Sequence, residues 1–105
     1  MQQRLNSAEI DAGLKQLDHW TLDAHKASVR KEWVFDNFQT AMRFFAQVGE
    51  LAESMDHHPE FLSNYTRMRL RLTTHDAYGL THKDFELAQQ IDHLVQQAFA
   101  SHLQA

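Results

Sequence analysis

Residues 65–74 read YTRMRLRLTT and alternate between apolar and polar side chains more clearly than any other segment of the chain. The two sets fall on opposite parities: Met68, Leu70 and Leu72 against Arg67, Arg69 and Arg71. Because successive side chains of a strand point to opposite faces, this alternation predicts a β-strand with one buried side and one solvent-facing side. Half-polar strands are typical of antiparallel sheets that are covered on one face only.

Shorter strands are expected on either side of this one. Upstream, residues 20–22 and 28–35 flank a polar turn, and in the second segment three apolar residues share one parity: Val29, Trp33 and Phe35. Downstream, Gly79 marks a turn, and a minor strand is expected over residues 78–80. The sheet is therefore predicted to contain three to four strands.

Two helices are predicted near the ends of the chain. Ser7 is placed to cap a helix over residues 8–17. Its apolar stripe consists of Ile10, Leu14 and Leu17. Thr81 and Asp84 have the spacing of a capping box and begin the last helix. The expected buried side of this last helix is formed by Phe85, Ala88, Ile91, Val95, Ala98 and Leu103.

The longest helical pattern covers residues 37–56. Asp36 and Gln39 resemble a capping box at its start, and Pro59 requires it to end at about residues 57–58. Its apolar stripe consists of Phe38, Ala41, Met42, Phe45, Val48, Ala52 and Met55. Two further apolar residues lie beside this stripe: Phe44 and Leu51. The resulting arc is wider than contact with one sheet requires, which indicates a partner on this helix.

The predicted order is helix, two strands, helix, one or two strands, helix. This order indicates an α+β two-layer sandwich, with an antiparallel sheet of three to four strands and three helices packed on one face. No internal repeat, low-complexity segment or linker rich in Gly, Ser or Pro divides the 105 residues. A single domain over residues 1–105 is therefore expected.

Composition narrows the function classes. The absence of cysteine excludes disulfide scaffolds, thiol nucleophiles, iron–sulfur clusters and zinc fingers. The net charge of −4 argues against a nucleic-acid partner. No apolar run approaches the roughly 20 residues that span a bilayer, and residues 1–10 lack the apolar core of a secretion signal, so a cytoplasmic protein is expected. Eight histidines stand against ten lysines and arginines, which points to imidazole chemistry.

Ionisable side chains are densest around one proline, Pro59. The cluster consists of Glu53, Asp56, His57, His58 and Glu60. His75 follows the clearest strand and Asp84 opens the last helix, so both can reach the same edge of the sheet. Three imidazoles with nearby carboxylates suit proton transfer near neutral pH, because a neutral ring accepts a proton and a protonated ring donates one. Loss of water from a carbon needs that pairing: an acid at the leaving hydroxyl and a base at a neighbouring N–H.

Simpler explanations exist for the same residues. A histidine pair at a helix C-terminus is favourable in itself, and a capping role accounts for Asp84 without chemistry. Zinc is an alternative, since three histidines and an acid are enough ligands, but adjacent histidines diverge and the HExxH spacing is absent. The arginines of residues 67–71 are interpreted as the solvated face of the sheet, because the acidic net charge and the lack of interleaved aromatic residues disfavour an anion-binding or nucleic-acid surface. The other histidines share no spacing and are interpreted as surface residues: His19, His25, His82, His93 and His102.

The spacing of the ionisable residues resembles a known family. Glu53-x-x-x-His57-His58-Pro59, five residues, Tyr65, nine residues, His75, eight residues and Asp84 form a pattern similar to that of the pterin-4a-carbinolamine dehydratases. The likeness covers residues 5–95 and includes the tryptophan segment that ends at Trp20. One departure is visible: where many relatives have two glycines before Leu-Thr, this chain has Tyr78-Gly79.

The resemblance implies dehydration of 4a-hydroxytetrahydropterin to quinonoid dihydropterin, which regenerates the pterin that aromatic amino-acid hydroxylases use. It implies a catalytic set of His57, His75 and His58. In that set, His57 and His75 would be the general acid/base pair at the 4a-hydroxyl, and His58 would bind and orient the pterin. No metal and no organic cofactor is expected, because the pterin is the substrate.

The resemblance also implies roles for the residues around the histidines. Pro59 and Glu60 would help His58 to bind the pterin. Asp84 would hold His75 or contact the pterin ring while it caps its helix. Glu53 lies one helical turn before the histidine pair and would support it from behind.

Family members are dimers or dimers of dimers joined through the long helix, so a homodimer or homotetramer through residues 37–56 is expected. Two alternatives to pterin recycling stay open. One is a non-catalytic interaction module with a vestigial cleft, since the animal members of the family also bind a transcription factor. The other is service to a different pterin pathway, such as molybdopterin metabolism. Retention of the three histidines and of Asp84 favours the enzyme.

Overall fold

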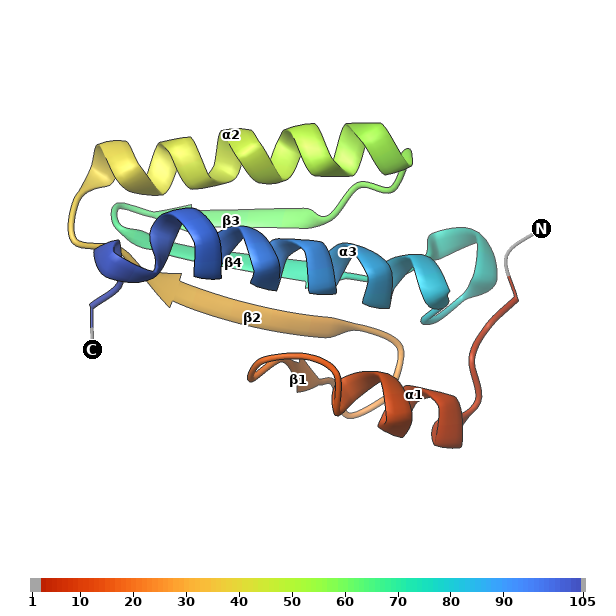
Figure 1. The fold of residues 1–105 in the computed structure, drawn as a ribbon. Helices are drawn as coiled ribbons and strands as arrows, with labels where there is room; N and C mark the ends of the chain where they lie inside the picture. Colours follow the sequence, from red (N-terminus) through yellow and green to blue (C-terminus); the bar gives the residue numbers. More distant parts are fainter. Residues whose placement is uncertain (1–2, 105) are drawn as a thin grey trace.

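Three helices and four strands make up the computed structural model, which describes residues 3–104 (Figure 1). In chain order they are α1 (Ser7–Leu14), β1 (Thr21–Leu22), β2 (Val29–Val34), α2 (Phe38–Met55), β3 (Glu60–Asn64), β4 (Arg67–Leu72) and α3 (His82–Leu94). A 3₁₀ turn at His75–Ala77 precedes α3. A π-helical turn at Val95–Phe99 and a 3₁₀ turn at Ala100–His102 follow it.

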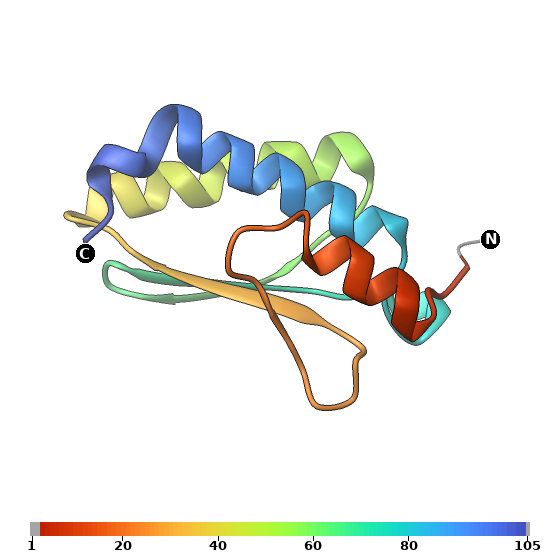
Figure 2. The same ribbon diagram turned by 60° about the horizontal axis from the view of Figure 1, so that its bottom comes forward.

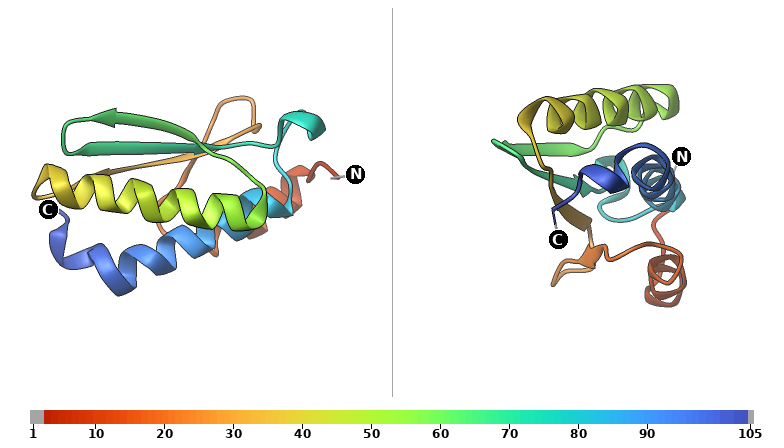
Figure 3. Two further views of the ribbon diagram at one scale, coloured as in Figure 1. Left: turned by 90° about the horizontal axis from the view of Figure 1, so that it is seen from above. Right: turned by 60° about the vertical axis from the view of Figure 1, so that its left-hand side comes forward.

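The four strands form one sheet in the order β1-β2-β4-β3, and every neighbouring pair is antiparallel. The three helices lie on one face of this sheet, as the two views of Figure 3 show. Figure 2 shows α2 and α3 lying side by side above the strands. The predicted α+β two-layer sandwich is therefore confirmed. None of the helices in residues 3–104 has the length and apolar character that crossing a bilayer requires.

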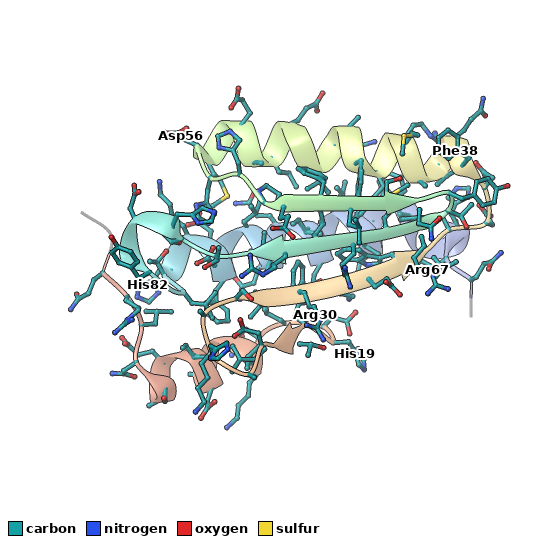
Figure 4. The ribbon with its side chains drawn as sticks, turned by 180° about the vertical axis from the view of Figure 1, so that it is seen from behind. His19, Arg30, Phe38, Asp56, Arg67 and His82 are labelled. Carbon is teal, nitrogen blue, oxygen red and sulfur yellow. The ribbon has the colours of Figure 1, made fainter. Side chains whose placement is uncertain are left out.

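The alternation of β4 divides the two faces of the sheet as the sequence predicts. Met68, Leu70 and Leu72 are fully buried against the helices. The arginines of β4 lie on the other face of the sheet. Figure 4 shows this face, with Arg67 of β4 and Arg30 of the neighbouring strand β2 labelled. The centre of the core is a cluster of five aromatic side chains: Trp20, Trp33, Phe35, Phe44 and Phe99. Burial of this apolar surface is the main term that holds the two layers together.

The fourth strand of the sheet is β3, which the sequence analysis did not predict. It pairs with β4 through a hairpin whose two-residue loop is Tyr65–Thr66, so β4 begins at Arg67. Tyr65 takes the left-handed conformation (φ 57°) that glycine or asparagine usually supplies, and the loop therefore carries no recognisable hairpin signal. The minor strand expected over residues 78–80 is absent, and only an isolated bridge joins Thr74 to Gly79.

Two helix caps are displaced by one residue from their predicted positions. Asn6, rather than Ser7, caps α1: its side chain accepts from the Glu9 N–H at 2.9 Å, and the helix ends at Leu14 instead of residue 17. Asn37, rather than Asp36, caps α2 and accepts from the Thr40 N–H at 2.8 Å. Ser, Asp and Asn are nearly equivalent as caps, so sequence alone does not choose between neighbouring candidates.

The buried face of α2 is centred on Phe44, which the sequence analysis placed beside the apolar stripe. Phe44 is fully buried, with ring centroids 4.9 Å from Trp33 and 5.1 Å from Phe35. Phe38 is instead 46% exposed, and Phe45 is half-buried. The helix is thus rotated so that its surplus apolar residues lie on the flank beside β3.

The end of the last helix also departs from its predicted periodicity. Ala98, expected on the buried side, is exposed, whereas Phe99 is 2% exposed and belongs to the core. The π-helical turn at Val95–Phe99 is the physical reason, because its wider i→i+5 bonding rotates the following residues away from the α-helical phase.

Candidate active site

The segment between α2 and β3 turns two adjacent histidines in opposite directions. Asp56 ends α2 in the left-handed conformation (φ 50°, ψ 44°), and the His57 N–H donates to the Ala52 carbonyl at 3.0 Å. After this sharp turn the His57 ring is buried, with a side chain 10% exposed, whereas that of His58 is 60% exposed. The expected divergence of the pair is therefore present, and only His57 enters the protein.

The His57 ring meets the carboxylate of Asp84, which lies in the first turn of α3. His57 Nε2 is 2.5 Å from Asp84 Oδ1, and Asp84 is fully buried. The end of α2 and the start of α3 lie at the same end of the molecule, as the labels of Asp56 and His82 show in Figure 4. The sequence expectation that these two elements converge is met.

Asp84 also receives two hydrogen bonds at its other oxygen. Asp84 Oδ2 accepts from the Thr81 backbone N–H at 2.9 Å, as a helix cap, and from the Thr74 hydroxyl at 2.8 Å. The Thr74 and Thr81 hydroxyl oxygens are themselves 2.8 Å apart. One buried carboxylate thus joins the end of α2, the segment after β4 and the start of α3, and its capping role does not compete with its contact to His57.

The contact constrains the tautomer of the His57 ring when the Asp84 carboxylate is ionised. An ionised carboxylate only accepts hydrogen bonds, so Nε2 of His57 donates to Asp84, and in the neutral ring Nδ1 carries the free lone pair. A carboxylate behind a histidine fixes the orientation of the ring and stabilises the imidazolium that forms when the ring takes up a proton. In this tautomer Nδ1 is the atom of the His57 ring that can accept a hydrogen bond or a proton.

His75 lies on a short loop that is closed at its base. We call residues 74–79 the His75 loop. Thr74 and Gly79 bond to each other through their backbones, with the Thr74 N–H donating to the Gly79 carbonyl at 2.9 Å. His75 is exposed, and among residues 3–104 no hydrogen bond links its ring to Asp84. Of the two contacts expected for Asp84, the one with His75 is therefore not made, and Asp84 instead holds His57 and Thr74; its contact with a pterin ring stays a prediction.

The remaining predicted residues lie around this centre. His58 Nε2 is 2.9 Å from Glu53 Oε1, in an exposed pair that orients His58 from one helical turn away. Glu60, the first residue of β3, is exposed and lies 3.7 Å from an Arg71 guanidinium nitrogen. Pro59 is half-buried between them.

The other histidines lie outside this centre, although one of them, His82, is exposed at the start of α3 beside it. His19 is 90% exposed and contacts Asp18, and its hydrogen bond, together with the charge of Lys31, lowers the pKa of the Asp18 carboxyl. His102 lies 3.4 Å from Asp36 at the far end of α3. Within residues 3–104, no three His, Asp or Glu side chains gather in a group that could hold a metal ion.

A family model described as pterin 4 alpha carbinolamine dehydratase matches residues 3–94. A protein of Chloroflexus aggregans is 45% identical over 92 residues, which cover 88% of this chain and 97% of that protein. A protein of Roseiflexus sp. is 42% identical over 95 residues, which cover 90% of this chain and all of that protein. Both bear the name "putative pterin-4-alpha-carbinolamine dehydratase".

This chain belongs to the pterin-4a-carbinolamine dehydratase family. Among solved structures, a transcriptional coactivator/pterin dehydratase from Brucella melitensis superposes with a TM-score of 0.83 at 33% identity, covering 87% of this chain and 97% of that one. A pterin dehydratase-like protein described as a RuBisCO assembly factor shares the fold, with a TM-score of 0.64 at 18% identity over 75% of this chain and 92% of that one. The dehydratase family is therefore established by sequence and by fold.

Thr74 is the site residue that the sequence analysis missed. A threonine at the end of a strand is ordinary, and nothing in its spacing links it to Asp84 ten residues later. Its position directly before the predicted His75 was the one available signal. In the structure its hydroxyl ties the His75 loop to the carboxylate that orients His57.

Proposed function

We propose that this protein catalyses the dehydration of a 4a-hydroxytetrahydropterin to the quinonoid dihydropterin. The observation that carries the proposal is the buried contact of His57 with Asp84 at the junction of three elements, each of which bears a residue of the family pattern. The contact has the form of a carboxylate-oriented acid/base histidine. Family membership supplies the substrate class.

The chemistry requires two proton transfers. The bond between C4a and the hydroxyl oxygen breaks, the neighbouring ring nitrogen loses its proton, and a C=N double bond forms as water departs. His57 takes the proton from the ring nitrogen through Nδ1, because Asp84 stabilises the resulting imidazolium. His75, exposed on its loop, delivers a proton to the departing hydroxyl. His58 binds and orients the pterin, with Pro59 and Glu60 beside it.

The decisive measurement is turnover of a freshly generated 4a-carbinolamine. Replacement of His57 or His75 by alanine should each lower kcat by about 100-fold or more, the usual contribution of one acid or base. His93→Ala is the matched control, since His93 is an exposed histidine near the end of α3. Near-normal turnover in both single variants would contradict the assignment of these two residues.

A non-catalytic interaction module is the second candidate. It is favoured by the similarity to the Brucella melitensis protein, which is described as a transcriptional coactivator as well as a pterin dehydratase. The same assay separates the two candidates, because an interaction module would leave the carbinolamine to dehydrate at its uncatalysed rate. If the wild type is active, we propose that its product re-enters the pterin pool used by an aromatic amino-acid hydroxylase.

We also propose that the protein forms a homodimer or homotetramer through α2. The flank of α2 beside β3 exposes an apolar surface. In it, the ring centroids of Phe45 and Phe61 are 4.8 Å apart, and those of the stacked Phe38 and Tyr65 rings are 6.1 Å apart. Phe61 is 41% exposed and Tyr65 is 71% exposed, and large apolar side chains exposed together on one flank mark an interaction surface. Sedimentation at micromolar concentration should show a dimer or tetramer that Phe38→Asp weakens. A strict monomer would contradict this part of the proposal.

A further inference from the structure

Beside the His75 loop, and outside the candidate active site, the surface is hollowed and carries three potential cations. The hollow has a volume of about 410 Å³ and opens between the segment before α1, the β1–β2 turn and Tyr78. Its ionisable lining residues, apart from the Tyr78 phenol, are Arg4, His25 and Lys26, and no carboxylate lines it. We call it the Arg4 hollow.

Arg4 is held across the His75 loop by its surroundings. The N–H of the next residue, Leu5, donates to the Leu80 carbonyl at 2.8 Å, and Figures 1 and 2 show the N-terminal segment running beside this loop. Arg4 itself lies 3.5 Å from the Tyr78 carbonyl oxygen. A Cβ on Gly79 would come within 2.7 Å of Arg4 Cδ, while Gly79 has no positive φ. Glycine at position 79 therefore makes room for the arginine and is not required by the backbone conformation.

Two residues that line the Arg4 hollow have unfavourable backbone conformations. Lys26 and Tyr78 both lie in the left-handed region, with φ of 56° and 58°, where a side chain is disfavoured. The Tyr78 side chain is 85% exposed, so burial does not compensate for this conformation. Residues held in such conformations cluster at ligand sites, where their position matters more than their stability.

Carboxylates lie near the Arg4 hollow but do not line it: Glu9 shares a separate, neighbouring hollow with Arg4. The acid of the same β1–β2 turn is Asp23, and its carboxylate accepts from the Ala27 N–H at 2.8 Å and from the Ser28 hydroxyl at 3.0 Å. It does not line the hollow, although the charge of His25 helps to lower the pKa of its carboxyl, so Arg4 and Lys26 are the cations that the hollow offers to a ligand. A cationic hollow in a chain of net charge −4 is complementary to an anion.

We propose that the Arg4 hollow binds an anionic group and, taking the proposed function as given, that this group is a carboxylate or phosphate on the C6 substituent of the pterin. C6 is bonded to the ring nitrogen that is itself bonded to the reacting C4a, so this substituent leaves the ring beside the bond that breaks. The His75 loop brings the hollow close to the proposed acid, His75. The Tyr78 N–H donates to the His75 carbonyl at 3.1 Å, so Tyr78, which lines the hollow, lies one turn of the chain beyond His75.

The test compares two stable fluorescent pterins, pterin-6-carboxylate and 6-methylpterin, by titration at low salt. The wild type should bind the carboxylate about tenfold more tightly, the size expected of two or three exposed charge contacts. Arg4→Ala combined with Lys26→Ala should remove this preference and leave the affinity for 6-methylpterin unchanged. Gly79→Ala, which displaces Arg4 without removing a charge, should reduce the preference as well.

Arg43→Ala is the control, since Arg43 lies in the first part of α2 and contacts Thr40. Its preference for the carboxylate should equal that of the wild type. Equal affinity of the wild type for both pterins, together with normal carbinolamine turnover, would overturn the anion subsite and leave the proposed function standing. Failure of both pterins to bind, together with absent turnover, would overturn the proposed function and the subsite with it.

Discussion

Replacement of Asp84 by alanine tests the role of the buried carboxylate most directly. The change removes the acceptor of the His57 ring, of the Thr81 N–H and of the Thr74 hydroxyl. The Thr74 hydroxyl keeps the Thr81 hydroxyl as a partner at 2.8 Å, so two buried donors are left unpaired. Each unpaired buried donor lowers the unfolding free energy by about 1–3 kcal/mol, and water that reaches the partly accessible His57 ring offsets some of this. The expected decrease in the unfolding free energy of Asp84→Ala is therefore roughly 3–4 kcal/mol.

Asp84→Asn separates charge from hydrogen bonding. Its amide oxygen can still accept from the Thr81 N–H, and its amide nitrogen faces His57, so the expected loss is about 1–2 kcal/mol. Domains of this size have unfolding free energies of roughly 5–15 kcal/mol, so both variants remain folded. Urea unfolding followed by fluorescence of the buried Trp20 and Trp33 measures the difference.

Asp76→Ala is the matched control, because Asp76 is an exposed carboxylate on the His75 loop. Its effect should stay within about 0.5 kcal/mol. A double-mutant cycle between His57→Ala and Asp84→Ala should give a coupling of about 1–3 kcal/mol. A loss below about 1 kcal/mol for Asp84→Ala, or a coupling near zero, would refute the reasoning that this carboxylate binds His57 and stabilises the junction.

Three further predictions concern other parts of the protein. Tyr78→Gly should raise the unfolding free energy by about 0.5–1 kcal/mol, because glycine adopts the left-handed conformation of residue 78 without steric cost. The gain should appear as a higher Tm. An unchanged or lower Tm would show that the tyrosine side chain makes a stabilising contact. Burial raises the pKa of Asp23, but hydrogen bonds from Ala27 and Ser28 outweigh it and hold the pKa below 3.8. The ionised Asp23 therefore stabilises the fold above pH 3.8, and this stabilisation is lost as the pH falls through the lowered pKa. In urea titrations, the difference in unfolding free energy between the wild type and Asp23→Asn should shrink below pH 3.8. A difference that stays constant with pH would contradict this prediction. Exhaustive chelation should leave carbinolamine turnover unchanged, and loss of activity that zinc restores would contradict an acid/base mechanism without metal.

Local patterns were sufficient to predict the fold class and most of its elements. The strict alternation of β4 separates a buried face from a wet one, and the capping box of Thr81 and Asp84 sets the start of α3. The strand β3 escaped prediction because a tyrosine occupies the left-handed position of its hairpin, where glycine would have given the signal. The rotation of α2 towards Phe44 escaped as well, since two adjacent phenylalanines fit the same apolar arc and tertiary packing decides between them.

The residues of the candidate site could be selected from the sequence, but their connections could not. Spacing indicated that His57, His75 and Asp84 would lie at one end of the sheet. Which histidine meets the carboxylate depends on the left-handed turn at Asp56, which directs His57 inward and His58 outward. The turn itself is held by local bonds from the Asp56 and His57 N–H groups to the Ala52 carbonyl, but an aspartate is not a usual signal for the left-handed position, so the sequence did not show which histidine would turn inward.

The attachment of Asp84 to three elements has a consequence for how relatives of this protein are compared. A carboxylate that caps a helix and anchors a strand end is under selection for folding, so it should persist in descendants that have abandoned chemistry. His75 is exposed, and its loop is held by backbone bonds and by the Thr74 hydroxyl, so folding does not require a histidine at position 75. Its loss in a homologue that retains Asp84 would therefore distinguish an inactive paralogue from a working enzyme more reliably than the motif as a whole.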